Sequence, residues 1–130
     1  MNCAYLRYGL FTHLCNALII IFLCAASSVR AEPKTIVVFG DSLTQGYGLP
    51  ADLGFVPRMG YWLAAQGVSV RMVNAGVSGD TTAGGLARLD WTLAEPADFV
   101  IVNLGSNDML RGLDPRLTYE NLQKIMDKLH

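Results

Sequence analysis

Three short polar segments combine glycine with hydroxyl, carboxylate or amide side chains, and together they hold most parts of an acyl-transfer site. A serine on a tight turn can present its hydroxyl as a nucleophile. Glycine N–H groups and an asparagine amide can donate hydrogen bonds to the oxyanion formed during acyl transfer. Such chemistry also needs a base and an acid that orients it. The segments are Gly40-Asp41-Ser42-Leu43-Thr44, Asn74-Ala75-Gly76-Val77-Ser78-Gly79-Asp80 and Gly105-Ser106-Asn107-Asp108.

Each polar segment directly follows a predicted β-strand. The strands are predicted over residues 35–39, 68–73 and 99–104, because these runs are rich in β-branched and aromatic residues. Apolar residues at helical spacing predict helices between and after the strands. Alternating strands and helices indicate a parallel sheet, in which ligands bind at the carboxyl ends of the strands. We therefore expect the three segments to converge on one crevice. The helices are predicted over residues 55–66, 82–91 and 118–129.

Taken singly, each segment also has an ordinary structural interpretation. Asp41 and Ser42 can cap a helix, Asp80 can do the same for the next helix, and Asn107-Asp108 can form an Asx turn. Their joint placement after three successive strands favours a shared site. Other catalytic motifs are absent from the sequence: there is no G-x-S-x-G elbow, Walker A pattern, G-x-G-x-x-G or H-E-x-x-H.

The first 31 residues differ in kind from the rest of the chain. Their only charges are Arg7 and Arg30, and they hold a 13-residue apolar run over residues 14–26. Val29 and Ala31 provide the small residues that signal peptidase requires, which predicts a signal peptide over 1–31 and export to the periplasm or beyond. The run is shorter than the roughly 20 residues of a membrane span, so we expect no stable anchor after cleavage.

The composition of residues 32–130 excludes several functions. They carry 8 Lys+Arg and 11 Asp+Glu, a net charge of 8 − 11 = −3, which lacks the basic footprint of a nucleic-acid-binding protein. They contain no cysteine and a single histidine, His130, so neither a thiolate nucleophile nor a cysteine-ligated zinc site is expected. We expect no metal and no other cofactor.

At these segments the sequence resembles the SGNH (GDSL) hydrolases, in particular the bacterial periplasmic arylesterase, thioesterase and lysophospholipase branch. The strings FGDSLTQGYGLP, NAGVSGDTTAGGLARLDW and LGSNDMLRGL carry the resemblance, which extends over residues 34–130. It implies a flavodoxin-like three-layer α/β/α fold built on a parallel sheet. It also implies a small acyl-ester, thioester or lysophospholipid substrate.

The resemblance also implies a role for each site residue. Ser42 is the expected nucleophile, and its own N–H joins the oxyanion hole. Gly79 supplies a second backbone N–H, and Asn107 supplies the side-chain donor. The expected supporting residues, which shape the site without reacting, are Asp41, Asn74 and Asp108.

This sequence departs from the family at the fourth signature block. That block, Asp-x-x-His, lies on a loop after the last strand and carries the acid and the base. Asp127 and His130 spell the same pattern, but they stand at the end of the helix predicted over 118–129. Asp127 lies off the apolar stripe expected on that helix, which consists of Tyr119, Leu122, Ile125, Met126 and Leu129. We therefore expect a coincidental match in a hydrolase domain that is incomplete at its C-terminus. Such a chain would keep three of five strands, with the third at an open edge, and would have marginal stability and little catalytic activity.

Two other functions fit the same segments. One is a non-catalytic remnant that uses the crevice to hold a carbonyl or glycan oxygen. The other is a flavodoxin-like module that binds phosphate at helix N-termini, although it gives Asn107 no role. Tyr47, Leu49 and the Met109-Leu110 pair flank the polar segments, and they can either line an acyl groove or simply pack against the fold.

Overall fold

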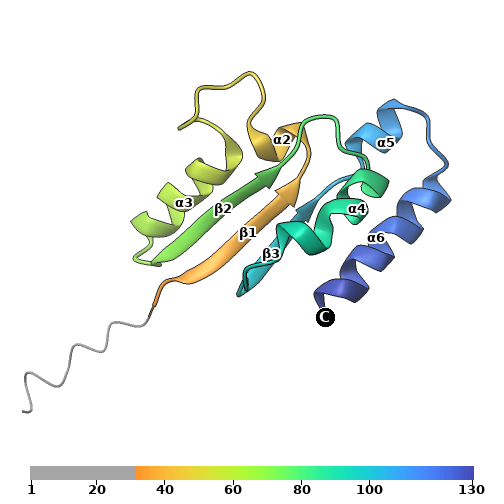
Figure 1. Cartoon of the computed structure of the whole chain (residues 1–130). Coiled ribbons are helices and arrows are strands. Elements are labelled where there is room, and N and C mark those ends of the chain that lie inside the picture. Colours follow the sequence, from red (N-terminus) through yellow and green to blue (C-terminus); the bar gives the residue numbers. More distant parts are fainter. Residues whose placement is uncertain (1–31) are drawn as a thin grey trace, which may run out of the picture. The chain divides into compact units, whose positions relative to one another are not determined.

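Three parallel β-strands in the order β2-β1-β3 form the centre of the structure (Figure 1). The computed structural model describes residues 32–130, and the signal peptide predicted over 1–31 lies outside them. The strands are β1 (Lys34–Gly40), β2 (Val70–Gly76) and β3 (Phe99–Asn103). At their carboxyl ends, Gly40 of β1 is paired with both Gly76 and Asn103. The loops that follow the strands therefore start at the same end of the sheet, as the sequence predicted.

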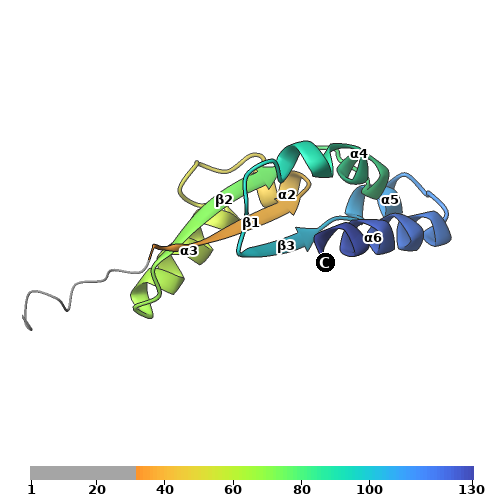
Figure 2. The same cartoon turned by 60° about the horizontal axis from the view of Figure 1, so that its bottom comes forward.

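Helices cover both faces of the central strand, as Figure 2 shows from a second direction. Helix α3 (Phe55–Ala65) packs on one face, and helices α4 (Thr82–Thr92) and α6 (Pro115–Leu129) pack on the other. Alternate residues of β1 point to the two helical layers, so the strand is buried on both sides. This burial explains why its sequence is a nearly continuous apolar run. The first core cluster contains Ile36, Val38 and Val56, and the second contains Phe39, Leu89 and Ile125.

Two further short helices follow the carboxyl ends of β1 and β3. The sequence analysis did not predict them. Helix α2 (Ser42–Gln45) is capped by the Asp41 carboxylate, which accepts from the Leu43 N–H at 3.0 Å. Helix α5 (Ser106–Leu110) begins after Gly105, whose φ is +118°. At four and five residues, these turns are too short to show helical periodicity in the sequence.

Two predicted elements have different bounds in the structure. Strand β2 includes Asn74, Ala75 and Gly76, because they pair with the end of β1. Val68 was wrongly placed in this strand, since its N–H bonds the Leu63 carbonyl and closes the end of α3. Helix α6 starts three residues earlier than predicted, where Asp114 caps it.

The apolar stripe of α6 also differs from the prediction. Tyr119 and Met126 are 67% and 45% exposed, so neither belongs to the buried face. Ile125 is fully buried, and Leu129 packs beside it. Asp127 is exposed, as its place off the stripe predicted.

Strand β3 borders only β1 within the described residues, which agrees with the predicted edge position. Phe99, the first residue of β3, is 59% exposed. Between residues 32 and 130, no helix combines the length and apolarity that crossing a membrane requires.

Gly76 allows the end of β2 to approach the turn that carries Ser42. A Cβ atom at this position would collide with the Gln45 backbone nitrogen and lie 2.8 Å from the Asp41 carbonyl oxygen. We expect Gly76→Ala to lower the free energy of unfolding by about 1–3 kcal/mol, because the neighbouring backbone atoms would have to shift to make room for the new Cβ atom. Urea denaturation measures this change.

Gly60→Ala is the matched control. There the new Cβ meets only the flexible Met72 side chain, at 3.1 Å, and alanine favours the helix. Equal destabilisation by the two substitutions would show that the close approach at Gly76 does not matter.

Asp98 joins the start of β3 to the start of β1. Its carboxylate accepts from the Lys34 ammonium and the Thr35 N–H, both at 2.7 Å. The hydrogen bond from Lys34, followed by that from Thr35, lowers the pKa of the Asp98 carboxyl below its ordinary value of 3.8. A lowered folded-state pKa stabilises the protein above the unfolded-state pKa, and this stabilisation is lost as pH falls through the folded-state value.

Asp98→Asn should therefore lose less stability than the parent chain on acidification. Urea unfolding at about pH 6 and about pH 3 measures the two losses. Identical losses in both proteins would mean that this carboxylate does not contribute to the acid response.

Candidate active site

Ser42 is the first residue of α2, and only Asp41 separates it from β1, the most buried strand. The residue is half-buried, so its side chain is reachable from solvent. The turn is closed at its far end by Gly46, whose φ of +84° favours glycine and whose N–H bonds the Ser42 carbonyl. The sequence thus builds a short, rigid strand-to-helix turn with a serine at its tip.

The Asp41 side chain holds this turn against the loop after β3, a name we use for residues 104–114, which include the short helix α5. Asp41 is fully buried, and its carboxylate accepts from the Ser106 hydroxyl at 2.5 Å and the Asn107 amide at 3.3 Å. With the Leu43 N–H, the carboxylate has three donors and, among residues 32–130, no ion-pair partner. Hydrogen bonds rather than a counter-charge therefore satisfy it.

Gly79 occupies a turn in which the Asp80 N–H bonds the Val77 carbonyl at 3.2 Å. Its φ of +84° is again a conformation that favours glycine. The Arg111 guanidinium donates to the Gly79 carbonyl at 2.7 Å, and the Asn107 amide donates to the Asp80 carbonyl at 2.8 Å. The two peptide groups that follow Gly79, 79–80 and 80–81, are thereby held by side chains of the loop after β3.

The Asn107 amide is shared between the other two segments. One of its bonds reaches Asp41 and the other reaches the Asp80 carbonyl. An amide nitrogen carries two hydrogens, so both are engaged in this state. The contact to Asp41 is the longer of the two, at 3.3 Å against 2.8 Å.

Asn74 and Asp108 brace the site from two further directions. Asn74 accepts from the Gly76 N–H at 3.0 Å and donates to the Gln45 carbonyl at 3.3 Å, which links β2 to α2. Asp108 is 2% exposed and accepts from both the N–H and the hydroxyl of Thr82 at the start of α4. A carboxylate suits this position because a helix N-terminus offers free N–H groups and a positive dipole end.

Asp127 and His130 lie at the other end of the structure. Helices α4 and α6 run in the same direction, since Asn121 contacts Thr82 near the start of α4 and Lys128 contacts Asp90 near its end. His130 follows the last turn of α6, and Figure 1 shows this end of the chain on the side of the sheet away from α2, the helix that Ser42 begins. The structure therefore does not bring Asp127 or His130 to Ser42.

One pair of site residues was missed in the sequence. Arg88 of α4 donates to the Asp80 carboxylate at 2.6 Å, directly beside the Gly79 turn. The available signal was an arginine two helical turns after an aspartate, but that spacing alone does not indicate that the arginine turns back toward the strands.

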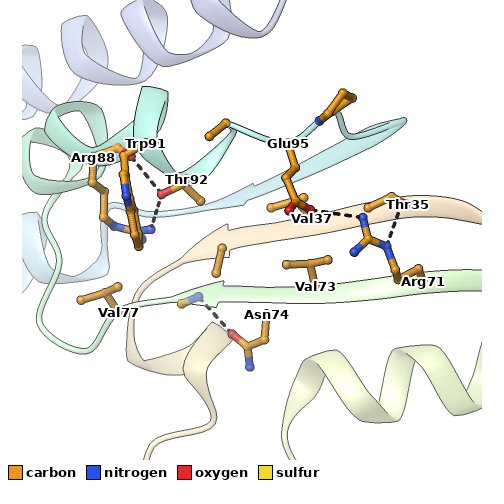
Figure 3. Close-up of a pocket in the computed structure, with 14 residues that line it drawn as sticks. Thr35, Val37, Arg71, Val73, Asn74, Val77, Arg88, Trp91, Thr92 and Glu95 are labelled. Carbon is orange, nitrogen blue, oxygen red and sulfur yellow. Dashed lines mark hydrogen bonds and ion pairs between the residues drawn. The ribbon is translucent and has the colours of Figure 1, made fainter.

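A groove of about 510 Å³ lies on the α4 side of the sheet, and none of Ser42, Gly79 and Asn107 lines it (Figure 3). Its floor includes Val37, Val73 and Ala75. No cluster of three or more potential metal ligands occurs among residues 32–130.

A parallel α/β sheet with serine, glycine and asparagine at the carboxyl ends of its strands is the arrangement of an SGNH-type hydrolase. Residues 38–130 match the model of the GDSL-like Lipase/Acylhydrolase family. The chain belongs to this family.

Relatives and solved structures support the same assignment. The chain is 45% identical over 101 residues to "Esterase TesA" of Pseudomonas aeruginosa, covering 76% of this chain and 50% of that protein. It is 36% identical over 108 residues to "Thioesterase 1/protease 1/lysophospholipase L1" of Escherichia coli, covering 82% and 50%. The crystal structure of AlinE4, an SGNH-hydrolase family esterase, superposes with a TM-score of 0.74 at 42% identity, covering 76% and 54%. The chain spans about half the length of the curated relatives it matches.

The buried Asp108 carboxylate gives a test of how the site is braced. Asp108→Ala leaves the Thr82 N–H and hydroxyl without their buried acceptor, so we expect a loss of about 1–3 kcal/mol in the free energy of unfolding. Asp127→Ala, at an exposed position, should change it by less than about 0.5 kcal/mol. Thermal or urea unfolding measures both, and a neutral Asp108→Ala would contradict the bracing role.

Proposed function

We propose that this chain carries the nucleophile and oxyanion hole of a secreted serine esterase. The observation that supports the proposal best is the Asp41 carboxylate, which links the Ser42 turn to Ser106 and Asn107. With the Gly79 turn bonded to the same loop, the expected nucleophile and its two partner donors lie at one end of the sheet. Membership of the GDSL-like family supports the same roles.

The proposed reaction is a two-step acyl transfer. The Ser42 oxygen attacks the acyl carbonyl carbon, and the hydroxyl proton passes to a base. The Ser42 and Gly79 N–H groups and the Asn107 amide stabilise the tetrahedral oxyanion. Its collapse leaves an acyl-serine ester and releases the alcohol or thiol, which takes the proton from the base. Water then hydrolyses the acyl-serine to the free acid and regenerated serine.

We infer that the base lies outside residues 32–130. His130, the one histidine within that range, is at the far end of α6. An oxyanion hole without its base retains only a small part of a serine hydrolase's rate enhancement. We therefore propose that the chain by itself turns over esters poorly.

The proposed substrates are acyl esters, thioesters or lysophospholipids. The names of the relatives as esterase, thioesterase and lysophospholipase support this range. Exposed apolar side chains beside the first and third polar segments are available to contact an acyl chain. These side chains are Leu43, Tyr47, Leu49, Met109 and Leu110, each at least 55% exposed.

We also propose that the protein acts in the periplasm or outside the cell. The support is the apolar run over residues 14–26 followed by Val29 and Ala31, which is typical of a cleaved signal peptide.

A second candidate is a non-catalytic domain that binds a carbonyl oxygen in the same crevice. The specific observation in its favour is that Asp41 and Asp80 already occupy both hydrogens of the Asn107 amide. Covalent labelling distinguishes the two functions, because only a reactive serine is phosphonylated.

The proposal is tested with a fluorophosphonate on the purified full chain. We expect slow, stoichiometric labelling that mass spectrometry maps to Ser42 and that Ser42→Ala abolishes. Turnover of p-nitrophenyl acetate should be negligible by comparison with full-length esterases. Binding of an ester analogue without any labelling would favour the second candidate.

A separate control addresses the base. His130→Ala should leave the labelling rate unchanged. Turnover close to that of full-length esterases, lost in His130→Ala, would refute the inference that the base lies outside residues 32–130.

A further inference from the structure

Arg88 connects the two segments that the proposed reaction must hold at a fixed separation. Its guanidinium donates to the Gly40 carbonyl at 3.0 Å, two residues before Ser42, and to the Asp80 carboxylate at 2.6 Å, one residue after Gly79. A single rigid side chain thus bridges the nucleophile turn and the glycine turn.

The surroundings of Arg88 restrict it to this geometry. A third nitrogen contact reaches the Thr92 hydroxyl at 3.2 Å, an interaction drawn in Figure 3. The guanidinium carbon lies 4.2 Å from the centre of the Phe39 ring, in the range of a cation–π interaction. The Arg88 and Asp80 side chains are only 18% and 16% exposed, so solvent screens their charges weakly.

Arg88 contacts the sheet at the Gly40 carbonyl, at the end of β1. This carbonyl accepts from Arg88 and also from the Val77 N–H at 2.9 Å, and Val77 begins the turn that contains Gly79. Displacing the guanidinium therefore disturbs the Gly79 turn both at Asp80 and at Val77.

The positive charge of Arg88 also affects the electrostatics of the Gly79 turn. Asp80 is a poorly solvated carboxylate beside the expected oxyanion donor, and an uncompensated negative charge there would oppose the negative charge that develops in the transition state. The Arg88 guanidinium compensates it. Lysine keeps the charge but replaces a planar fork with a single ammonium group, so it can satisfy only part of this network.

We propose that Arg88 is a positioning residue, which sets the separation of the Ser42 turn from the Gly79 turn and neutralises Asp80 beside the oxyanion hole. The inference rests on the proposed function, because it gives Ser42 and Gly79 their roles. The groups it acts on are the Gly40 carbonyl, the Val77–Asp80 turn and the Asp80 carboxylate.

The first test needs no catalytic activity. Amide hydrogen exchange of the Val77 and Asp80 N–H groups is measured by NMR in the full chain and in Arg88→Met. We expect both rates to rise on the order of 10- to 100-fold, because a charge-assisted hydrogen bond is lost. Arg88→Lys should show a smaller rise, and it decides the question if Arg88→Met does not fold.

Lys128→Met is the matched control, since it removes a more exposed ion pair, with Asp90, from α4, the helix that carries Arg88. The exchange rates of Val77 and Asp80 should not change in it. Rates in Arg88→Met and Arg88→Lys equal to those of Lys128→Met would overturn the proposal and leave Arg88 as an ordinary packing residue.

The second test separates binding from reaction. We expect Arg88→Met to lower the saturating rate of Ser42 phosphonylation about tenfold or more, while the half-saturating fluorophosphonate concentration stays unchanged. Adding Asp80→Asn to Arg88→Met should restore part of the rate, because the unpaired carboxylate is gone. A double variant as slow as the product of the two single effects would overturn the charge-neutralising role.

Failure of the parent chain to label at Ser42 would refute the proposed function, whereas the exchange rates would still decide whether Arg88 positions the two turns.

Discussion

The geometry of the site depends on one buried carboxylate. Asp41 is fully enclosed, and no ion-pair partner within residues 32–130 offsets its charge. Leaving such a group without donors would cost several kilocalories per mole, so its three hydrogen bonds are strongly favoured in the folded state. Two of them come from Ser106 and Asn107, at the end of a different strand. Satisfying Asp41 therefore fixes the Ser42 turn relative to the loop after β3.

Hydrogen bonds to other carboxylates also connect the segments around the site. The Asp108 carboxylate accepts from Thr82 at the start of α4 and from Thr118 of α6, and the Asp80 carboxylate accepts from the Nε of Arg88. Asp108 thereby joins two helices, and Arg88 also reaches the Gly40 carbonyl, 48 residues away along the chain. The loops at the carboxyl ends of the strands are consequently cross-linked by hydrogen bonds, and Ser42 at the tip of α2 is held in a half-buried position. A reactive site benefits from such rigidity because donors that are already in place need no reorganisation during the reaction.

The sequence predicted the parts of this arrangement that local pattern controls. The apolar run of β1 and the positions of Ser42, Gly79 and Asn107 after strands follow from hydrophobicity and from glycine at strand ends. The end of β2 was missed because the polar Asn74 pairs in register with Val38, which is a tertiary effect. Helices α2 and α5 were missed because each depends on the residue that begins it rather than on periodicity. Arg88 was missed because its partners lie 8 and 48 residues away along the chain.

The central claim is that Asp41 holds the Ser42 turn against the loop after β3, and a double-mutant cycle tests it most directly. The free energy of unfolding is measured by urea denaturation for the parent chain, Asp41→Ala, Ser106→Ala and the double variant. If the two side chains stabilise the fold through their shared hydrogen bond, the coupling energy should be on the order of 1–3 kcal/mol. Effects that add within about 0.5 kcal/mol would contradict the claim, because they would mean that the two segments are held together by other contacts.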